Sequence, residues 1–225
     1  MASLQMAQAQ SFPNSSRLKE VKKKREADIK KALADEGFRW GKPVFIRIFK
    51  TEKQLELWIK EDKTYRLYKT YDVCTFGSGG LGPKLKEGDG MAPEGFYFVR
   101  PKKFNPYSSF HLAFNLGYPN AYDRAHKRTG SALMVHGSCV SIGCYAMTDS
   151  LIEEIYLIAE AALKNGQPFF RVHIFPFHMT NLATGLVKNS KWYDYWLNLK
   201  TGYDYFEKHK LPPNVRVQNK KYVFD

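Results

Sequence analysis

Hydrophobic residues recur at helical spacing in the first part of the chain. Between residues 18 and 33 they fall near one face, which predicts a helix. A serine cap is expected at Ser15 or Ser16, and Gly37 suits the end of the helix. The basic run 22–25 lies mostly off the apolar face. We expect it to face solvent, and a contact with an anionic surface is the alternative.

Beyond Pro43 the hydrophobic period changes to two, which is the period of a strand. Aliphatic residues occupy alternate positions over 44–49 and again over 55–60. A turn at 61–63 then leads into a returning segment at 65–71. This pattern predicts a β-meander that contains a hairpin.

Further strands, two more helices and a terminal hairpin are expected in the rest of the chain. The connection 77–95 is rich in Gly and Pro and contains lysines, but it has no P-loop pattern, so phosphate binding is disfavoured. Ser150 and Glu153 have the spacing of a capping box near the start of a helix. The expected strands are 96–99, 110–116, 132–135 and 169–175, the helices 148–164 and 192–210, and the hairpin 215–224.

Composition places the chain among globular proteins and leaves its anionic partner open. The chain has 225 residues, of which 44% are hydrophobic, and a formal net charge of +13. A core is therefore expected, and the charge favours nucleic acid, anionic lipid or an acidic cell-wall polymer. No apolar run is long enough for a transmembrane segment. The first ten residues lack the features of a signal peptide, which we interpret as one that was removed or replaced.

The chain has three cysteines, which do not suggest a disulfide framework. Cys74 lies in an apolar and aromatic run, so a buried inert thiol is expected. Cys139 and Cys144 are too few for a closed zinc site, and neither a metal nor another cofactor is expected.

The segment 136–144 carries the candidate chemistry. His136 follows the apolar strand 132–135 and precedes Cys144 by eight residues, so an imidazole base and a thiol nucleophile could meet there. Cys139 is the rival nucleophile. Gly143 favours Cys144, because a residue without Cβ allows a tight turn whose consecutive N–H groups converge on one oxygen, as in an oxyanion hole. Of the other histidines, His111 and His126 could approach the cleft but are more often surface or packed residues, and His173, His178 and His209 are interpreted as structural.

These residues resemble the catalytic motif of the L,D-transpeptidase (YkuD-type) family, which has a His-Gly pair, a spacer and Ser-His-Gly-Cys. His136-Gly137 and Ser141-Ile142-Gly143-Cys144 match the two ends. The spacer is very short, Ile142 replaces the second histidine of the motif, and Ala146 replaces its arginine. Together with the blocks 82–90, 93–97 and 115–124, these departures are similar to the YafK-like branch.

The resemblance implies an α+β fold: a mainly β catalytic domain with packed helices, an N-terminal helix and a C-terminal helical extension. The expected domains are a flexible lead with a basic helix (1–42), the catalytic domain (43–178) and an aromatic-rich helical extension (179–225). It implies that Cys144 is the nucleophile, His136 the base and the Gly137 carbonyl its orienter. Gly143 and Cys144 N–H groups would bind the oxyanion, and Ser141 would support the turn.

The family also implies a periplasmic enzyme that forms an acyl-enzyme on peptidoglycan stem peptides containing meso-diaminopimelate. The resemblance to the YafK-like branch points to hydrolysis of the amide that links diaminopimelate to the C-terminal lysine of the outer-membrane lipoprotein. Transpeptidation by an attacking amine stays open as the alternative. Diaminopimelate carries a carboxylate and needs a nearby cation. The candidate substrate-binding residues are Arg124 first and Arg128 second, with Tyr118, Asn115 and His111 beside them.

Two other classes of function compete with an enzyme. A non-catalytic cell-wall-binding module would use the net charge and the aromatic residues of 192–206, which could stack on sugars. Packing of those aromatics onto the core is the simpler interpretation. Nucleic-acid binding would rest on charge alone, without a recognised module, so no nucleic acid is expected.

Overall fold

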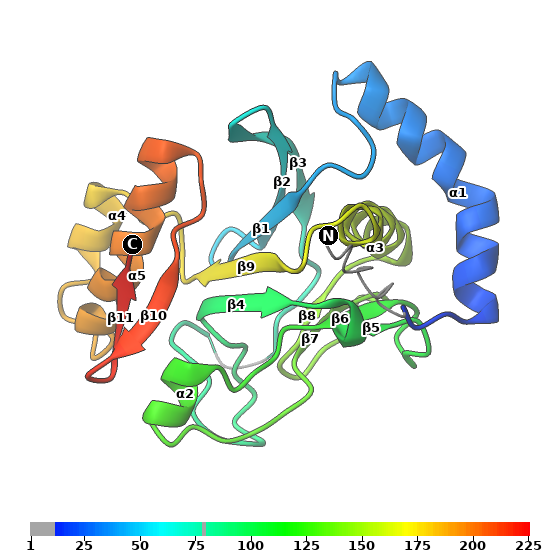
Figure 1. The fold of residues 1–225 in the computed structure, drawn as a ribbon. Coiled ribbons are helices and arrows are strands. Elements are labelled where there is room, and N and C mark those ends of the chain that lie inside the picture. The colour runs from blue at the N-terminus through cyan, green and yellow to red at the C-terminus, as the bar shows by residue number, and fades with distance from the viewer. Residues whose placement is uncertain (1–11, 78–79) are drawn as a thin grey trace, which may run out of the picture.

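The computed structural model describes residues 12–77 and 80–225 and has an α+β architecture (Figure 1). Most of the flexible lead expected over 1–15 lies outside these residues. The helices are α1 (Ser16–Asp35), α2 (Ala121–Ala125), α3 (Asp149–Lys164), α4 (Asn181–Leu186) and α5 (Tyr193–His209), with a 3-10 turn at Pro101–Lys103. The strands are β1 (Val44–Phe49), β2 (Gln54–Glu61), β3 (Thr64–Asp72), β4 (Gly95–Val99), β5 (Phe104–Asn105), β6 (Ala113–Asn115), β7 (Met134–His136), β8 (Tyr145–Ala146), β9 (Phe170–Phe175), β10 (Val215–Gln218) and β11 (Lys221–Phe224).

The central sheet has the strand order β3-β2-β1-β9-β4. The meander predicted over 44–71 forms its first three strands, which pair antiparallel. β9 then lies parallel to β1 and antiparallel to β4, so the chain brings residues far apart in sequence into one sheet. All six residues of β1 are buried, because helices cover both faces of this part of the sheet.

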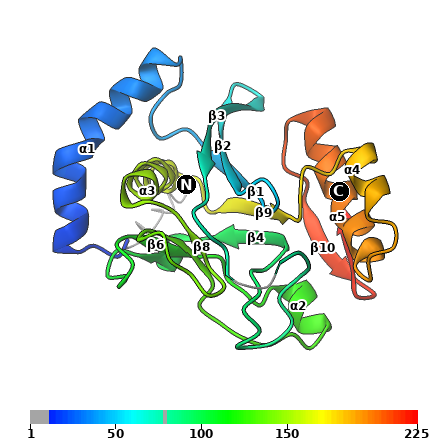
Figure 2. The same ribbon diagram turned by 180° about the vertical axis from the view of Figure 1, so that it is seen from behind.

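α3 packs between α1 and the sheet, as Figures 1 and 2 show from opposite sides. Ser15 caps α1 by accepting a hydrogen bond from the N–H of Leu18. Lys22 forms an ion pair with Glu160 at 2.6 Å, and Arg25 forms one with Glu153 at 3.0 Å. The expectation that the basic run faces solvent is therefore wrong for these two residues, because acidic residues of α3 attract them.

The start of α3 also differs from the prediction. The helix begins at Asp149 with Thr148 as its N-cap residue, and Thr148 makes no side-chain capping hydrogen bond. Ser150 lies inside the first turn, so the capping box predicted from Ser150 and Glu153 is wrong. Glu153 instead bonds Arg25 and His111 from neighbouring elements.

The C-terminal helix and hairpin cover the opposite face of the central sheet (Figure 1). Four of the seven aromatic residues in the stretch 192–206 are buried, and Trp196 donates a hydrogen bond to Glu94 at 2.8 Å. Their burial confirms the interpretation of core packing and removes those four rings as sugar-stacking surfaces. None of the described helices combines the length and the apolar composition that a bilayer crossing requires.

A disulfide joins Cys74 to Cys139 across 65 residues of sequence. The expectation that Cys74 is an inert free thiol is therefore wrong. Cys139 is remote from Cys74 in the sequence, and only the tertiary fold brings the two sulfur atoms together. Cys144 is the free cysteine among the described residues.

Candidate active site

A small second sheet with the order β5-β6-β7-β8 holds the candidate site. β7 and β8 pair in parallel, with Val135 opposite Tyr145 and His136 opposite Ala146. Side chains two residues apart on a strand point to the same face. Cys144 immediately precedes β8 and is two residues from Ala146. Continued one residue beyond the strand, this alternation predicts His136 and Cys144 on one face of the pair of strands. The eight-residue spacing in the sequence is the length of the loop that joins the two parallel strands.

The imidazole of His136 is held in one tautomer by the backbone. Its Nδ1 lies 2.6 Å from the carbonyl oxygen of Gly137, which is the contact expected from the sequence. Because a carbonyl can only accept, Nδ1 carries the proton and Nε2 keeps its lone pair. The ring also packs against Phe110 at 4.8 Å between centroids. Burial lowers the pKa of His136, partly offset by the bond to Gly137, so the ring is a neutral base at pH 7.

The Cys144 thiol lies in a half-buried environment with few donors. The N–H of Met134 donates to Sγ at 3.4 Å, and the thiol faces the carbonyl of Ala132 at 3.8 Å. Burial raises the pKa of Cys144, while the Met134 N–H and the Lys84 ammonium pull that pKa partway back. In the described part of the chain no hydrogen bond joins Sγ to His136. Both the thiol and the imidazole are therefore neutral at pH 7, so the thiol must lose its proton before it can react as a thiolate.

Ser141 organises the turn before Cys144. Its Oγ accepts hydrogen bonds from the N–H groups of Gly143 at 3.1 Å and Cys144 at 2.7 Å, and it donates to the carbonyl of Cys144 at 2.8 Å. The two N–H groups converge on one oxygen as predicted, but that oxygen belongs to Ser141. The expected open oxyanion hole is thus absent from this arrangement, because the Ser141 hydroxyl already satisfies both donors.

Two glycines allow the close contacts that hold the site together. A Cβ on Gly137 would lie 2.5 Å from Asp149 Oδ1 and 2.9 Å from the Cβ of His111. Asp149 uses the same oxygen to accept the N–H of Ser138 at 2.8 Å. A Cβ on Gly77, whose φ is +85°, would lie 2.3 Å from the carbonyl of Gly90. Larger residues at either position would push the site loops apart.

A cavity of about 400 Å³ opens beside Cys144 and is bordered by the Gly- and Pro-rich connection. Lys84 lines it with a largely buried side chain, whose Nζ donates to Asp89 Oδ1 at 2.7 Å and to the carbonyl of Lys86 at 3.0 Å. Burial opposes ionisation of Asp89, but hydrogen bonds from Lys84 and from backbone N–H groups lower its pKa to about 2. An ammonium group has three donors, so one donor of Lys84 remains for a ligand.

Sequence reasoning missed Lys84 and the disulfide. One signal for Lys84 was an acidic residue five positions later within a Gly-rich loop. One signal for the disulfide was the cysteine count, because a nucleophile among three cysteines leaves a pair.

The five candidate substrate-binding residues do not border this cavity. Arg128 is buried against Asp123 at 2.8 Å. The single O–H of Tyr118 lies between the carbonyls of Lys84, at 3.2 Å, and Thr129, at 3.3 Å, and its shared hydrogen bond supports the cavity wall from behind. The other three make contacts of their own: Arg124 with the carbonyl of Pro119, Asn115 with the N–H of Gly117, and His111 with Glu153.

The family model described as the L,D-transpeptidase catalytic domain (YkuD) matches residues 43–174. The chain belongs to this family. The resemblance drawn from the motif is thereby confirmed, and the chain carries an enzyme domain of a family that acts on peptidoglycan.

Two relatives of this L,D-transpeptidase domain protein share 50% identity with it over 183 residues, which are 81% of this chain and 74% of each relative. Both bear the name "Putative L,D-transpeptidase YafK", one from Escherichia coli (strain K12) and the other from Escherichia coli O157:H7. The crystal structure of the helical cell shape determining protein Pgp2 from Campylobacter jejuni aligns over 85% of this chain and 80% of that chain. Its identity is 19% and its TM-score is 0.46.

The two residue replacements in the family motif have clear positions in the fold. Ile142, where the motif has a histidine, is 90% exposed and borders the cavity. Ala146, where the motif has an arginine, is fully buried opposite His136. The site thus lacks two polar groups that its family motif places beside the nucleophile.

Proposed function

We propose that this protein is a periplasmic cysteine hydrolase that releases the outer-membrane lipoprotein from peptidoglycan. Its substrate is the amide between meso-diaminopimelate and the C-terminal lysine of that lipoprotein. The observation that carries the proposal is the pair of His136 and Cys144 on one face of β7 and β8, beside a cavity that holds Lys84.

The chemistry follows from the protonation states. Nε2 of His136 takes the thiol proton as Cys144 Sγ attacks the amide carbon, and the same proton passes to the leaving lysine amine. A thioester forms and the C–N bond breaks. Water then attacks the thioester, gives its proton to Nε2, and the thiolate leaves and is reprotonated. Rotation of the Ser141 side chain would release the N–H groups of Gly143 and Cys144 for the oxyanion.

Hydrolysis rather than transfer is supported by what surrounds the thioester. A second amine substrate must be bound and deprotonated before it attacks. Exposed Ile142 and buried Ala146 offer it no hydrogen-bond acceptor from their side chains, so two polar groups that could bind an amine are missing. Water needs no binding subsite, and Nε2 of His136 can deprotonate it.

Lys84 takes the role that sequence analysis assigned to Arg124 or Arg128. Lys84 is the positively charged residue that lines the cavity, whereas Arg128 forms an ion pair with Asp123. We assign the free carboxylate of diaminopimelate to Lys84. Because Asp89 holds the ammonium in place, the cation is positioned before substrate arrives.

The disulfide supports the periplasmic location. Disulfides form and persist in oxidising compartments and are rare in the cytosol. The Cys74–Cys139 bond leaves Cys144 as the free thiol of the described chain, which is what a thiol nucleophile requires.

The test is to incubate the protein with lipoprotein-linked muropeptides, with and without D-amino acids, and to weigh the products. Hydrolysed muropeptide alone is expected. A D-amino-acid adduct would establish transpeptidation instead. Cys144→Ala should abolish turnover, and turnover retained in this variant would refute the nucleophile. Binding to sacculi without turnover by the wild type would indicate a cell-wall-binding module.

Lys84→Met should lower kcat/KM by about tenfold to a hundredfold, as expected for a lost charge-assisted hydrogen bond. Lys86→Met is the matched control, because Lys86 is exposed two residues away and contributes only its carbonyl to Lys84. Equal kcat/KM in the two variants would refute the role of Lys84.

A further inference from the structure

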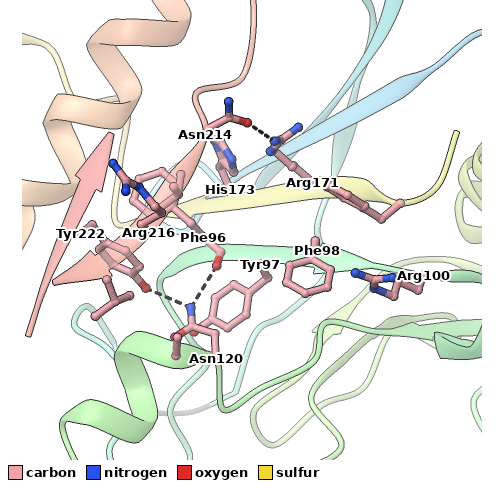
Figure 3. A pocket seen from close by; sticks show the side chains of 14 residues that line it. Phe96, Tyr97, Phe98, Arg100, Asn120, Arg171, His173, Asn214, Arg216 and Tyr222 are labelled. Atoms are coloured by element: carbon pink, nitrogen blue, oxygen red, sulfur yellow. Dashed lines mark hydrogen bonds between the residues drawn. The ribbon is translucent and has the colours of Figure 1, made fainter. Parts of the chain in front are cut away.

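A second pocket, of about 290 Å³, lies on the central sheet at its junction with the C-terminal hairpin (Figure 3). Its walls come from β4 and β9 on one side and from β10 and the start of α2 on the other. It shares no lining residue with the cavity beside Cys144. The proposed reaction uses none of its side chains.

All the charged side chains that line this pocket are basic. Arg100, Arg171 and Arg216 line it, and its lining contains no carboxylate. Arg171 donates to the neutral Asn214 at 2.7 Å, and burial lowers the pKa of Arg171. Arg216 pairs with Asp225 at 2.9 Å, outside the lining. Arg171 thus has a neutral partner, and Arg216 keeps its acidic partner outside the pocket. Guanidinium groups that face a pocket without carboxylates attract oxyanions and bind them through paired N–H groups.

The pocket also offers an apolar surface next to these cations. Phe98 is 48% exposed, and the guanidinium of Arg100 lies 5.4 Å from its ring centroid. Phe169 lies beneath both Arg100 and Arg171, at 5.7 and 5.2 Å. Arginine stacked on an aromatic ring keeps its N–H edge free for a ligand while the ring contacts the apolar part.

His173 gives an independent indication of a ligand. Its ring is 1% exposed, forms part of the pocket wall, and lies between β9 and Asn214 (Figure 3). Within the part of the chain that the structure describes, neither ring nitrogen has a hydrogen-bond partner. Burial, together with Arg171 and Arg47, keeps the pKa of His173 well below its usual value, so the ring is neutral, with one donor and one acceptor. Buried polar atoms without partners are rare and call for an explanation.

We propose that this pocket is a second binding site, for an oxyanion joined to an apolar body. The oxyanion contacts Arg171 and Arg216, the apolar body packs on Phe98 and Phe169, and a polar atom of the ligand pairs with His173. Two sources share this chemistry: the carboxylate end of a short peptide and a phosphate ester. The volume is at the lower end of ligand pockets, so a small ligand or the end of a chain fits.

The test is a titration of the 225-residue protein, monitored by NMR of the histidine ring signals and by calorimetry. The probes are N-acetylphenylalanine, its neutral amide, phenyl phosphate and inorganic phosphate. We expect N-acetylphenylalanine or phenyl phosphate to bind with a Kd of about 1 mM or below and to shift the His173 signals. The tighter of the two identifies the source. The amide should bind at least about tenfold more weakly.

Variants separate this pocket from other basic surface. Arg171→Gln and Arg216→Gln should each weaken binding about tenfold, and His173→Phe should weaken it while keeping the ring volume. Arg39→Gln is the matched control, because Arg39 is exposed and paired with Glu61 outside the pocket. Cys144→Ala should bind as the wild type does, so a failure of the proposed hydrolase activity leaves this test intact.

Three results would overturn the proposal. The first is no saturable shift up to about 20 mM of either anionic probe. The second is equal binding of the amide. The third is an Arg39→Gln variant that loses as much affinity as the pocket variants.

Discussion

Removal of the Cys74–Cys139 disulfide is expected to destabilise the protein strongly. We consider the double variant Cys74→Ser, Cys139→Ser, which leaves Cys144 in place. The disulfide closes a loop of 65 residues. The chain-entropy relation for a loop of that length gives a loss of about 4 kcal/mol in the free energy of unfolding, because the unfolded chain regains the freedom that the cross-link removed.

The measurement is urea unfolding followed by circular dichroism. With a slope of about 2.5 kcal/mol per molar urea, the midpoint should fall by about 1.5 M. Wild-type protein reduced with dithiothreitol should unfold like the double variant. The Cys144→Ser variant keeps both cysteines of the disulfide but lacks the free thiol. Comparing its oxidised and reduced forms therefore separates effects of the cross-link from effects of the free thiol.

The disulfide should also matter for activity, because Cys139 lies in the loop between His136 and Cys144. The N–H of Cys139 donates to the carbonyl of Met147 at 3.0 Å, and the N–H of Cys74 donates to that of Ala146 at 2.8 Å. The cross-link thus fastens the site loop to the segment after β3. We expect kcat/KM to fall in the double variant even without urea. Coinciding midpoints of reduced and oxidised wild type, together with unchanged kcat/KM, would refute this reasoning.

Three further predictions concern buried groups. Lys50→Met should lower the free energy of unfolding by about 3–5 kcal/mol in urea titrations, because it leaves the buried Glu94 carboxylate without its partner. Lys50 bonds Glu94 at 3.1 Å and the Gly82 carbonyl at 2.9 Å, and both charged side chains are fully buried. A loss below about 1 kcal/mol would contradict this. Alkylation of Cys144 by iodoacetamide should keep accelerating above pH 9, since burial raises its pKa, and a plateau reached at neutral pH would show a thiolate that the structure does not support. His173 has a pKa well below 6.5, so its contribution to stability is complete above pH 6.5 and is lost as the pH falls toward the folded-state pKa, by up to about 1.4 kcal/mol per pH unit. His173→Phe should flatten this acid dependence in unfolding measured from pH 7 to pH 4, and an identical slope in the variant would assign the loss to other groups.

Local features of the fold were predictable because their causes lie within a few residues. The Ser15 cap, the strands of the meander and the helix after Trp192 follow from side-chain periodicity and capping, which neighbours in sequence decide. The pairing of β1 with β9 was not predictable in this way. About 120 residues separate them, and no local pattern specifies the partner.

The same distinction between local and tertiary causes applies to the candidate site. The sequence alone predicted the pair of His136 and Cys144 and revealed the family motif, because the residues of both lie in one short segment that joins the neighbouring strands β7 and β8. Tertiary structure alone decided that Cys74 bonds Cys139 and that Lys84 lines the cavity beside Cys144. Each of those outcomes depends on which distant groups the fold brings within bonding distance, and on which polar atoms are already satisfied once they are buried.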